Sequence, residues 1–105
     1  MKKIVMPVLV LILFLWAGEY GRIQGRITDI DTNEPLEGVN VIIKGTDLGT
    51  TTGRDGFYLV LYVPPGRYSL KISSVNYKEV LIDNLIVNAD QTTKLDLKLK
   101  ETVIT

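Results

Sequence analysis

The chain has 105 residues, enough for one domain, and carries 12 basic and 12 acidic side chains. It contains no cysteine and no histidine. This composition excludes a disulfide framework, thiolate or histidine-dependent nucleophilic catalysis and the common zinc sites. The mixed charges provide no basic surface for nucleic acid. We therefore expect a protein that is not an enzyme and that has no cofactor, no metal and no nucleic-acid partner.

Residues 1–17 have the pattern of a secretory signal peptide. Two lysines precede an uncharged, mainly aliphatic stretch from Ile4 to Gly18, and a small residue, Ala17, stands where cleavage is expected. The alternatives are an uncleaved membrane anchor and a buried core segment. A spanning helix needs about 20 apolar residues, and this stretch is shorter and contains Pro7. Removal of the helical signal peptide would leave 10 basic and 12 acidic residues, a net charge of −2.

From Arg22 onward, polar and apolar residues alternate in short runs separated by turn-forming residues, which predicts a series of strands. Asp55-Gly56 and Pro65-Gly66 mark two of the turns. The predicted inward faces are Ile23 and Ile27; Val39, Val41 and Ile43; Tyr68, Leu70 and Ile72; and Leu95, Leu97 and Leu99. The last run, 94–100, alternates most regularly and predicts a single strand.

Two other runs are less simple. Residues 57–63 are apolar on both faces, which predicts a central strand with Phe57, Leu59, Leu61 and Val63 on one face. Truncation of Phe57 or Leu97 to alanine is then expected to cost about 2–5 kcal/mol. Residues 79–88 are irregular around Asp83-Asn84, where we expect either one bent strand or two strands.

Six or seven short strands, each with an apolar face, must bury these faces against one another. The sequence therefore predicts an all-β fold, a seven-stranded β-sandwich of Greek-key type over residues 22–100.

One loop has the spacing of metal-binding oxygens. Asp29, Asp31 and Asn33 match the first three ligands of a calcium loop, but Glu34 stands where glycine is needed and Asn40 where a bidentate glutamate is needed. We interpret the segment as a turn in which Asp31 and Asn33 cap their own backbone.

Tyrosines offer a second kind of site. Tyr58, Tyr62, Tyr68 and Tyr77 could stack on sugar rings or line a partner surface. The alternative is that these side chains pack in the sandwich with their hydroxyls at its rim.

The last five residues, Glu101, Thr102, Val103, Ile104 and Thr105, are β-prone and directly follow the final strand. They are either the frayed end of that strand or an extended peptide that another protein captures by β-augmentation.

The mature chain resembles the carboxypeptidase regulatory-like domains, which have a transthyretin-like (prealbumin-type) β-sandwich. The resemblance extends from about Ile23 to Leu99 and rests on turn and core residues in this order: Gly25–Asp29, Glu34–Val41, Gly45–Thr46, Gly49–Thr52, Asp55–Tyr58 and Val63–Tyr68. It implies a prealbumin-like fold and no catalytic residues.

In Gram-negative bacteria, similar domains with a signal peptide stand at the N-terminus of TonB-dependent outer-membrane receptors, ahead of a short TonB-contacting segment. Residues 101–105 fall where that segment would begin. The resemblance thus implies a fragment of a nutrient-uptake receptor, located in the periplasm or at the outer membrane, with a TonB-type protein partner. The alternatives are a free-standing exported binding or adhesion module for glycan or an envelope protein, and the accessory domain of an exported hydrolase.

Overall fold

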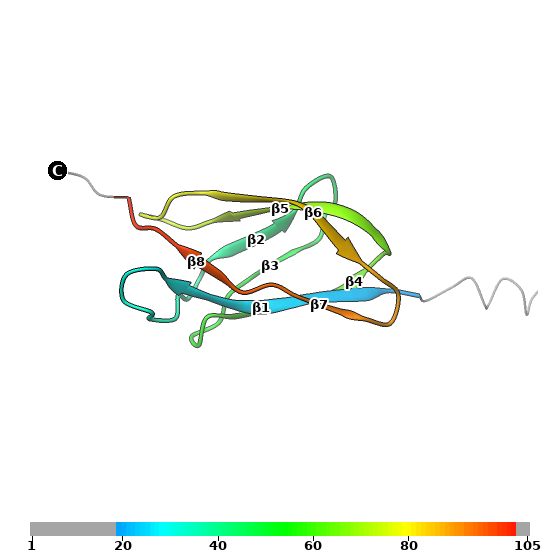
Figure 1. Ribbon diagram of the computed structural model, residues 1–105, viewed down its shortest axis with the longest axis horizontal. Coiled ribbons are helices and arrows are strands. Elements are labelled where there is room, and N and C mark those ends of the chain that lie inside the picture. The colour runs from blue at the N-terminus through cyan, green and yellow to red at the C-terminus, as the bar shows by residue number, and fades with distance from the viewer. Residues whose placement is uncertain (1–18, 103–105) are drawn as a thin grey trace, which may run out of the picture.

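The computed structural model describes residues 19–102, which form eight strands in two packed sheets (Figure 1). The strands are β1 (Gly21–Asp29), β2 (Asn40–Ile43), β3 (Gly49–Thr51), β4 (Phe57–Val63), β5 (Gly66–Ser73), β6 (Val80–Val87), β7 (Thr92–Lys94) and β8 (Leu97–Leu99). The predicted all-β, prealbumin-like sandwich is confirmed, with eight strands in place of seven. The predicted signal-peptide helix lies outside the described residues, among which no helix is long and apolar enough to span a membrane.

The first sheet is built around β1. This strand pairs antiparallel with β4 on one side and parallel with β7 and then β8 on the other. Its side chains alternate as predicted: Ile23 and Ile27 are completely buried, whereas Arg22 and Arg26 lie on the exposed outer face. Period-two alternation predicts this strand well because only one of its faces meets the core.

The second sheet has the order β3-β2-β5-β6 and is antiparallel throughout. Its inner face and that of the first sheet share one core, composed of Ile23, Ile27, Val39, Val41, Ile43, Tyr58, Val60, Val63, Leu70, Ile72, Val87 and Leu99. The predicted inward faces of 39–43 and 68–72 are confirmed, with Tyr68 half-buried at the margin.

The run 94–100 is not the predicted single strand: Lys94 ends β7, and β8 begins only at Leu97. Between them, the Leu95 amide still donates to the Gln24 carbonyl at 2.8 Å. The Tyr58 hydroxyl donates to the Leu95 carbonyl at 2.6 Å, and the Arg26 amide donates to Asp96 Oδ1 at 2.9 Å. Side chains thus replace part of the backbone hydrogen-bond ladder at the break between β7 and β8. The ladder is interrupted there, and this explains why the sandwich has eight strands in place of seven.

The run 57–63 is an edge strand, β4, and not the central strand predicted from its two apolar faces. Tyr58 and Val60 point into the core, whereas Phe57 and Leu61 are 38% and 44% exposed on the outer face of the first sheet. The alternation is then interrupted, since Val63 is buried again. The expectation that Phe57 is a core residue was therefore wrong, because exposed apolar residues on an edge strand look like a second buried face.

Residues 80–87 form one bent strand, β6, and not the two strands that were the alternative. Its register with β5 shifts between the pairs Tyr68–Leu85 and Leu70–Ile82. Two residues of β6, Asp83 and Asn84, therefore face the single Ser69, which is a β-bulge. The Ser69 hydroxyl donates to Asp83 Oδ1 at 2.7 Å.

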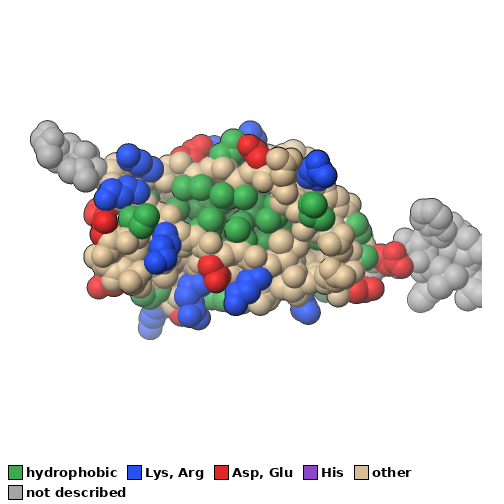
Figure 2. Space-filling model, in the orientation of Figure 1, with side chains coloured by type: hydrophobic (Ala, Val, Ile, Leu, Met, Phe, Trp, Pro, Cys, Tyr) green, Lys and Arg blue, Asp and Glu red, His purple; other side chains and the backbone are tan. Residues whose placement is uncertain are grey.

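The sandwich is not fully closed along the side where β6 and β8 lie at the free edges of the two sheets. Figure 2 shows apolar side chains gathered on this side, in the area that β6 and β8 flank in Figure 1. The half-buried apolar residues of these strands and of the break before β8 are Val80, Ile82, Leu85, Leu95 and Leu97. This side of the core is covered only in part by the protein itself.

We predict that Ile27→Ala lowers the free energy of unfolding by about 2–5 kcal/mol, because it removes a completely buried side chain from the central strand. Phe57→Ala is the matched control in the neighbouring strand and should cost clearly less, because Phe57 is 38% exposed. Urea unfolding of both variants checks this. Equal losses would contradict the assignment of the inner and outer faces of the first sheet.

Gly25 lies where β1 passes closest to the break between β7 and β8. A Cβ atom added there would overlap with the backbone carbonyl of Leu95 and would lie 3.0 Å from the Tyr58 hydroxyl. We predict that Gly25→Ala destabilises the fold by about 1–3 kcal/mol or more, because backbone must move to admit the methyl group. Gly53→Ala is the control, since its nearest neighbour atom would be 3.6 Å away. Comparable urea midpoints for the two variants would contradict this packing.

Candidate functional site

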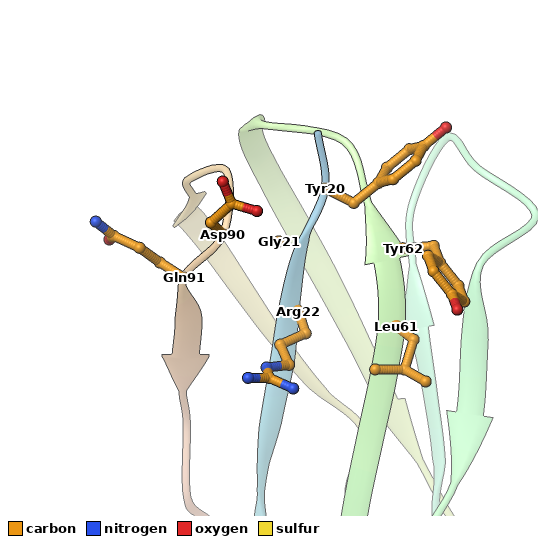
Figure 3. Close-up of a pocket in the computed structure, with 7 residues that line it drawn as sticks. All are labelled: Tyr20, Gly21, Arg22, Leu61, Tyr62, Asp90 and Gln91. Atoms are coloured by element: carbon orange, nitrogen blue, oxygen red, sulfur yellow. The ribbon is translucent and has the colours of Figure 1, made fainter. Parts of the chain in front are cut away.

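A cavity opens on the outer face of the first sheet, at the end where β1 and β7 begin and β4 finishes. It has a volume of about 270 Å³ and is lined by Tyr20, Gly21, Arg22, Leu61, Tyr62, Asp90 and Gln91. Figure 3 shows these residues coming from three adjacent segments of the sheet. Two aromatic rings, an arginine and a carboxylate thus line one small hollow, whereas the Gln91 side chain points away from them.

A bulge in the edge strand places Tyr62 at this cavity. Gly21 pairs with Val63 and Ile23 with Val60, so Leu61 and Tyr62 together face only Arg22. Tyr62 has φ = 58°, in the left-handed region that a bulky residue rarely adopts, and it is 70% exposed. The bulge therefore turns the ring outward when regular alternation would turn it toward the core.

Tyr20 completes the aromatic side of the cavity. Its ring packs edge-to-face against that of Tyr62, with centroids 5.9 Å apart and an interplanar angle of 89°. The Asp90 amide donates to the Tyr20 carbonyl at 2.9 Å, and the Arg22 amide donates to the Gln91 carbonyl at 3.1 Å. These backbone bonds fix the turn before β7 against the start of β1.

The polar side chains of the cavity keep much of their hydrogen-bonding capacity. Arg22 Nε donates to Thr92 Oγ1 at 2.7 Å, and this is the one hydrogen bond that the described residues show for its side chain. Within the same part of the chain, the Asp90 and Gln91 side chains have none. The cavity thus combines flat apolar rings with both donors and acceptors.

Of the four tyrosines predicted as a ligand platform, only Tyr62 lies at this cavity. Tyr58 is buried in the core, and burial raises the pKa of its hydroxyl. The Tyr68 hydroxyl donates to the Pro64 carbonyl, and the Tyr77 hydroxyl donates to Asp29 Oδ2 at 2.8 Å. Tyr20 was missed because it precedes the first alternating run, where no pattern indicates its neighbours.

The predicted turn at residues 29–33 is confirmed, but a different residue caps it. Asp29 Oδ1 accepts from the amides of Asp31 and Thr32 at 2.8 and 3.1 Å. The side chains of Asp31 and Asn33, predicted to cap their own backbone, instead accept from two lysines of the C-terminal segment. Lysine ammonium groups thus bind the oxygens that a calcium loop would direct at its ion.

These two contacts are Lys98 Nζ to Asn33 Oδ1 at 3.1 Å and Lys100 Nζ to Asp31 Oδ2 at 3.0 Å. Within residues 19–102, no three acidic side chains come together in a way that could hold a metal ion.

The predicted partner-binding segment begins on the sandwich. Glu101 forms an isolated antiparallel bridge with Tyr77, and the Thr102 amide donates to the Asn76 carbonyl at 2.7 Å. The Lys78 amide likewise donates to the Lys100 carbonyl at 2.8 Å. The segment therefore starts by pairing with residues 76–78, whereas its residues Val103, Ile104 and Thr105 lie outside the described part of the chain.

The same Tyr77 connects this segment to the turn at Asp29. The hydrogen bond that the Tyr77 hydroxyl donates to Asp29 holds the pKa of this carboxyl below its ordinary value of 3.8. The hydrogen bonds from the amides of Asp31 and Thr32 lower the pKa further. The hydrogen bond to Asp29 in turn raises the pKa of Tyr77 to about 12, and burial and the negative charge of Asp29 add to this effect. The hydrogen bond between Asp29 and Tyr77 thus joins the end of β1 to residues 76–78, which pair with residues 100–102.

This pair predicts a pH dependence. The pKa of Asp29 is lower in the folded protein than in the unfolded chain, so the charged carboxylate stabilises the fold. This stabilisation is present above pH 3.8 and is lost as the pH falls through the folded-state pKa. The stability advantage of the wild type over Tyr77→Phe should therefore shrink in acid. It should shrink again as the pH rises from 10 toward 12, where Tyr77 ionises.

Urea unfolding from acid to alkaline pH measures this difference. Tyr68→Phe is the control, because its hydroxyl donates to a backbone carbonyl that does not titrate. Its difference from the wild type should stay constant in acid. The same constancy for Tyr77→Phe would contradict the proposed charge coupling.

Known proteins resemble this chain mainly as parts of larger molecules. Carboxypeptidase D of Mus musculus is 34% identical over 82 residues, which are 78% of this chain but only 6% of that protein. A chain of a type II cohesin–X–dockerin complex from Acetivibrio cellulolyticus superimposes with a TM-score of 0.62 and 29% identity, covering 73% of this chain and 52% of the other.

The Bacillus anthracis TIE protein gives a TM-score of 0.64 at 21% identity, over 79% of this chain and 17% of that one, and this likeness shows the fold alone. The family of carboxypeptidase regulatory-like domains matches residues 22–100, nearly the whole sandwich. The chain therefore belongs to the carboxypeptidase regulatory-like domain family.

Proposed function

We propose that this protein is a non-catalytic interaction module of the bacterial envelope, located in the periplasm as the N-terminal extension of a TonB-dependent outer-membrane receptor. Its role there is to contact a TonB-type protein or to act as a spacer ahead of the segment that follows it. Membership of a regulatory-like family supports a role without catalysis. The signal-peptide pattern of residues 1–17 and the lack of cysteine support export to a bacterial envelope.

The observation that carries this proposal is the direction in which the chain runs through the sandwich. β7 and β8 run parallel to β1, so the chain enters at one end of the first sheet and leaves at the other (Figure 1). The nine residues of β1 span roughly 30 Å at about 3.3 Å per residue. This geometry carries the exit of the chain to the end of the sandwich opposite its N-terminus, as suits a spacer ahead of the segment that follows.

At the exit, the pairing of residues 100–102 with residues 76–78 keeps the departing chain extended. An extended segment is the form in which β-augmentation recruits a peptide, because main-chain donors and acceptors then line up with the edge of the partner's sheet. The β-branched residues Thr102, Val103, Ile104 and Thr105 favour the same conformation. We expect a TonB-type protein to bind here through backbone hydrogen bonds.

The partner interaction predicts a difference between two substitutions at one position. Ile104→Pro removes a backbone donor and should weaken binding of the periplasmic domain of a TonB-type protein at least about tenfold. Ile104→Ala keeps the donor and should weaken binding much less. Titration of that domain against the protein recovered from periplasm measures both. No binding by the wild type, or equal binding by the two variants, would refute the proposed contact.

A separate measurement tests the location. After expression of the whole gene in a Gram-negative host, we expect the protein in the periplasmic fraction and a mass that lacks residues 1–17. Recovery with these residues intact would favour the membrane-anchor alternative, and recovery from the cytoplasm would overturn the proposal of export.

A further inference from the structure

The backbone strain in the described residues is distributed unevenly. Five residues other than glycine have positive φ angles: Asn33, Tyr62, Asn76, Asn84 and Asp90. Four of these are asparagine or aspartate, which tolerate the left-handed region because their short side chains bond to nearby backbone. Tyr62 is the one bulky side chain among them, and its conformation costs free energy that an asparagine would largely avoid.

Protection of the sheet edge does not account for a tyrosine at this position. A bulge on an edge strand discourages pairing with other chains, and β4 and β6 are both edge strands with a bulge. In β6, the positive-φ position of the bulge is occupied by Asn84. The bulge in β4 would serve the same purpose with the same residue, so the retained ring at Tyr62 indicates a use for the ring itself.

The surroundings of the ring define that use. Tyr62 and Tyr20 present flat apolar surfaces at the rim of the cavity, and Arg22 and Asp90 supply it with donors and acceptors (Figure 3). A pyranose has matching chemistry: one face of C–H groups packs on an aromatic ring, while its hydroxyls both donate and accept. The volume of about 270 Å³ is close to the lower end of typical small-ligand cavities.

We propose that this cavity is a carbohydrate-binding site, in which Tyr62 and Tyr20 pack against a sugar ring and Arg22 and Asp90 bond to its hydroxyls. The one positive and one negative side chain in the cavity balance, so the ligand class is a neutral oligosaccharide. The cavity lies at the start of β1, whereas Glu101 lies beyond its other end. The inference is therefore independent of the proposed contact with a TonB-type protein.

Titration of the protein, expressed from its full gene, with maltohexaose, cellohexaose, xylohexaose and mannohexaose tests this inference. The readout is the pattern of amide chemical shifts in two-dimensional NMR. We expect at least one hexasaccharide to bind with a dissociation constant on the order of 1 mM, since a shallow cavity covers little of the ligand. The shifts should centre on Tyr20–Arg22, Leu61–Tyr62 and Asp90–Gln91. Absence of binding by all four sugars up to about 20 mM would overturn the inference.

Variants at Tyr62 separate function from structure. Tyr62→Asn should weaken sugar binding at least about tenfold and leave the urea midpoint unchanged or higher, because asparagine tolerates the positive φ. Tyr62→Phe keeps the ring and should bind within about threefold of the wild type. Phe57→Ala, an exposed aromatic on the same strand outside the cavity, should bind as the wild type does.

Two results would contradict the assignment even if a sugar binds. One is full binding by Tyr62→Asn, which would place the sugar elsewhere. The other is tighter binding of hexagalacturonate than of all four neutral sugars, which would make the ligand class anionic. This result is expected only if the attraction of the anion to Arg22 is stronger than its repulsion by Asp90. Loss of binding together with a lower urea midpoint in Tyr62→Asn would show that the tyrosine is structural.

Discussion

The close approach of β1 to the C-terminal strands is the constraint on which the rest of the structure depends. β1 is the only described strand that pairs with three others, and its inward residues Ile23 and Ile27 are completely buried. At Gly25, the backbone of the break between β7 and β8 lies so close that no Cβ fits. The Tyr58 hydroxyl reaches the Leu95 carbonyl beside it and fastens the edge strand to the C-terminal segment.

This parallel pairing also separates the two candidate sites. The cavity with Tyr20 and Tyr62 surrounds the start of β1, and the bridge between Tyr77 and Glu101 lies past its end. An antiparallel C-terminal strand would have brought the exit of the chain back to the cavity. The parallel arrangement leaves each end of the sandwich free for a different contact.

The sequence predicts the fold wherever a strand buries only one face and continues without a bulge. The alternations at Ile23–Ile27 and Val39–Ile43 and the turn at Asp29 were therefore readable from residue types alone. Residues 57–63 were misread because an edge strand can expose apolar residues such as Phe57 and Leu61. The bulge at Leu61–Tyr62 also shifts the face that each later residue presents, and only the pairing with β1 shows it.

The candidate cavity was beyond prediction for a related reason. Its side chains come from segments about 30 to 40 residues apart in the sequence, and backbone hydrogen bonds bring them together. The coupling of Asp29 to Tyr77, 48 residues apart, likewise has no local signal. Residue types indicated that tyrosines were available, but the backbone decided that Tyr58 completes the core and Tyr62 faces solvent.

The two bulges show how one structural device can serve two purposes in the same fold. Both interrupt an edge strand, and both use a left-handed residue to do so. At Asn84 the residue type suits the backbone, and protection of the edge is a sufficient explanation. At Tyr62 a bulky residue adopts a positive φ angle that it disfavours, so the fold is less stable than it would be with asparagine at this position. Strain of this kind persists when the strained side chain contributes to function instead of folding. The neighbouring ring of Tyr20 and the open hydrogen-bonding groups of the cavity point to the proposed binding of a sugar ring.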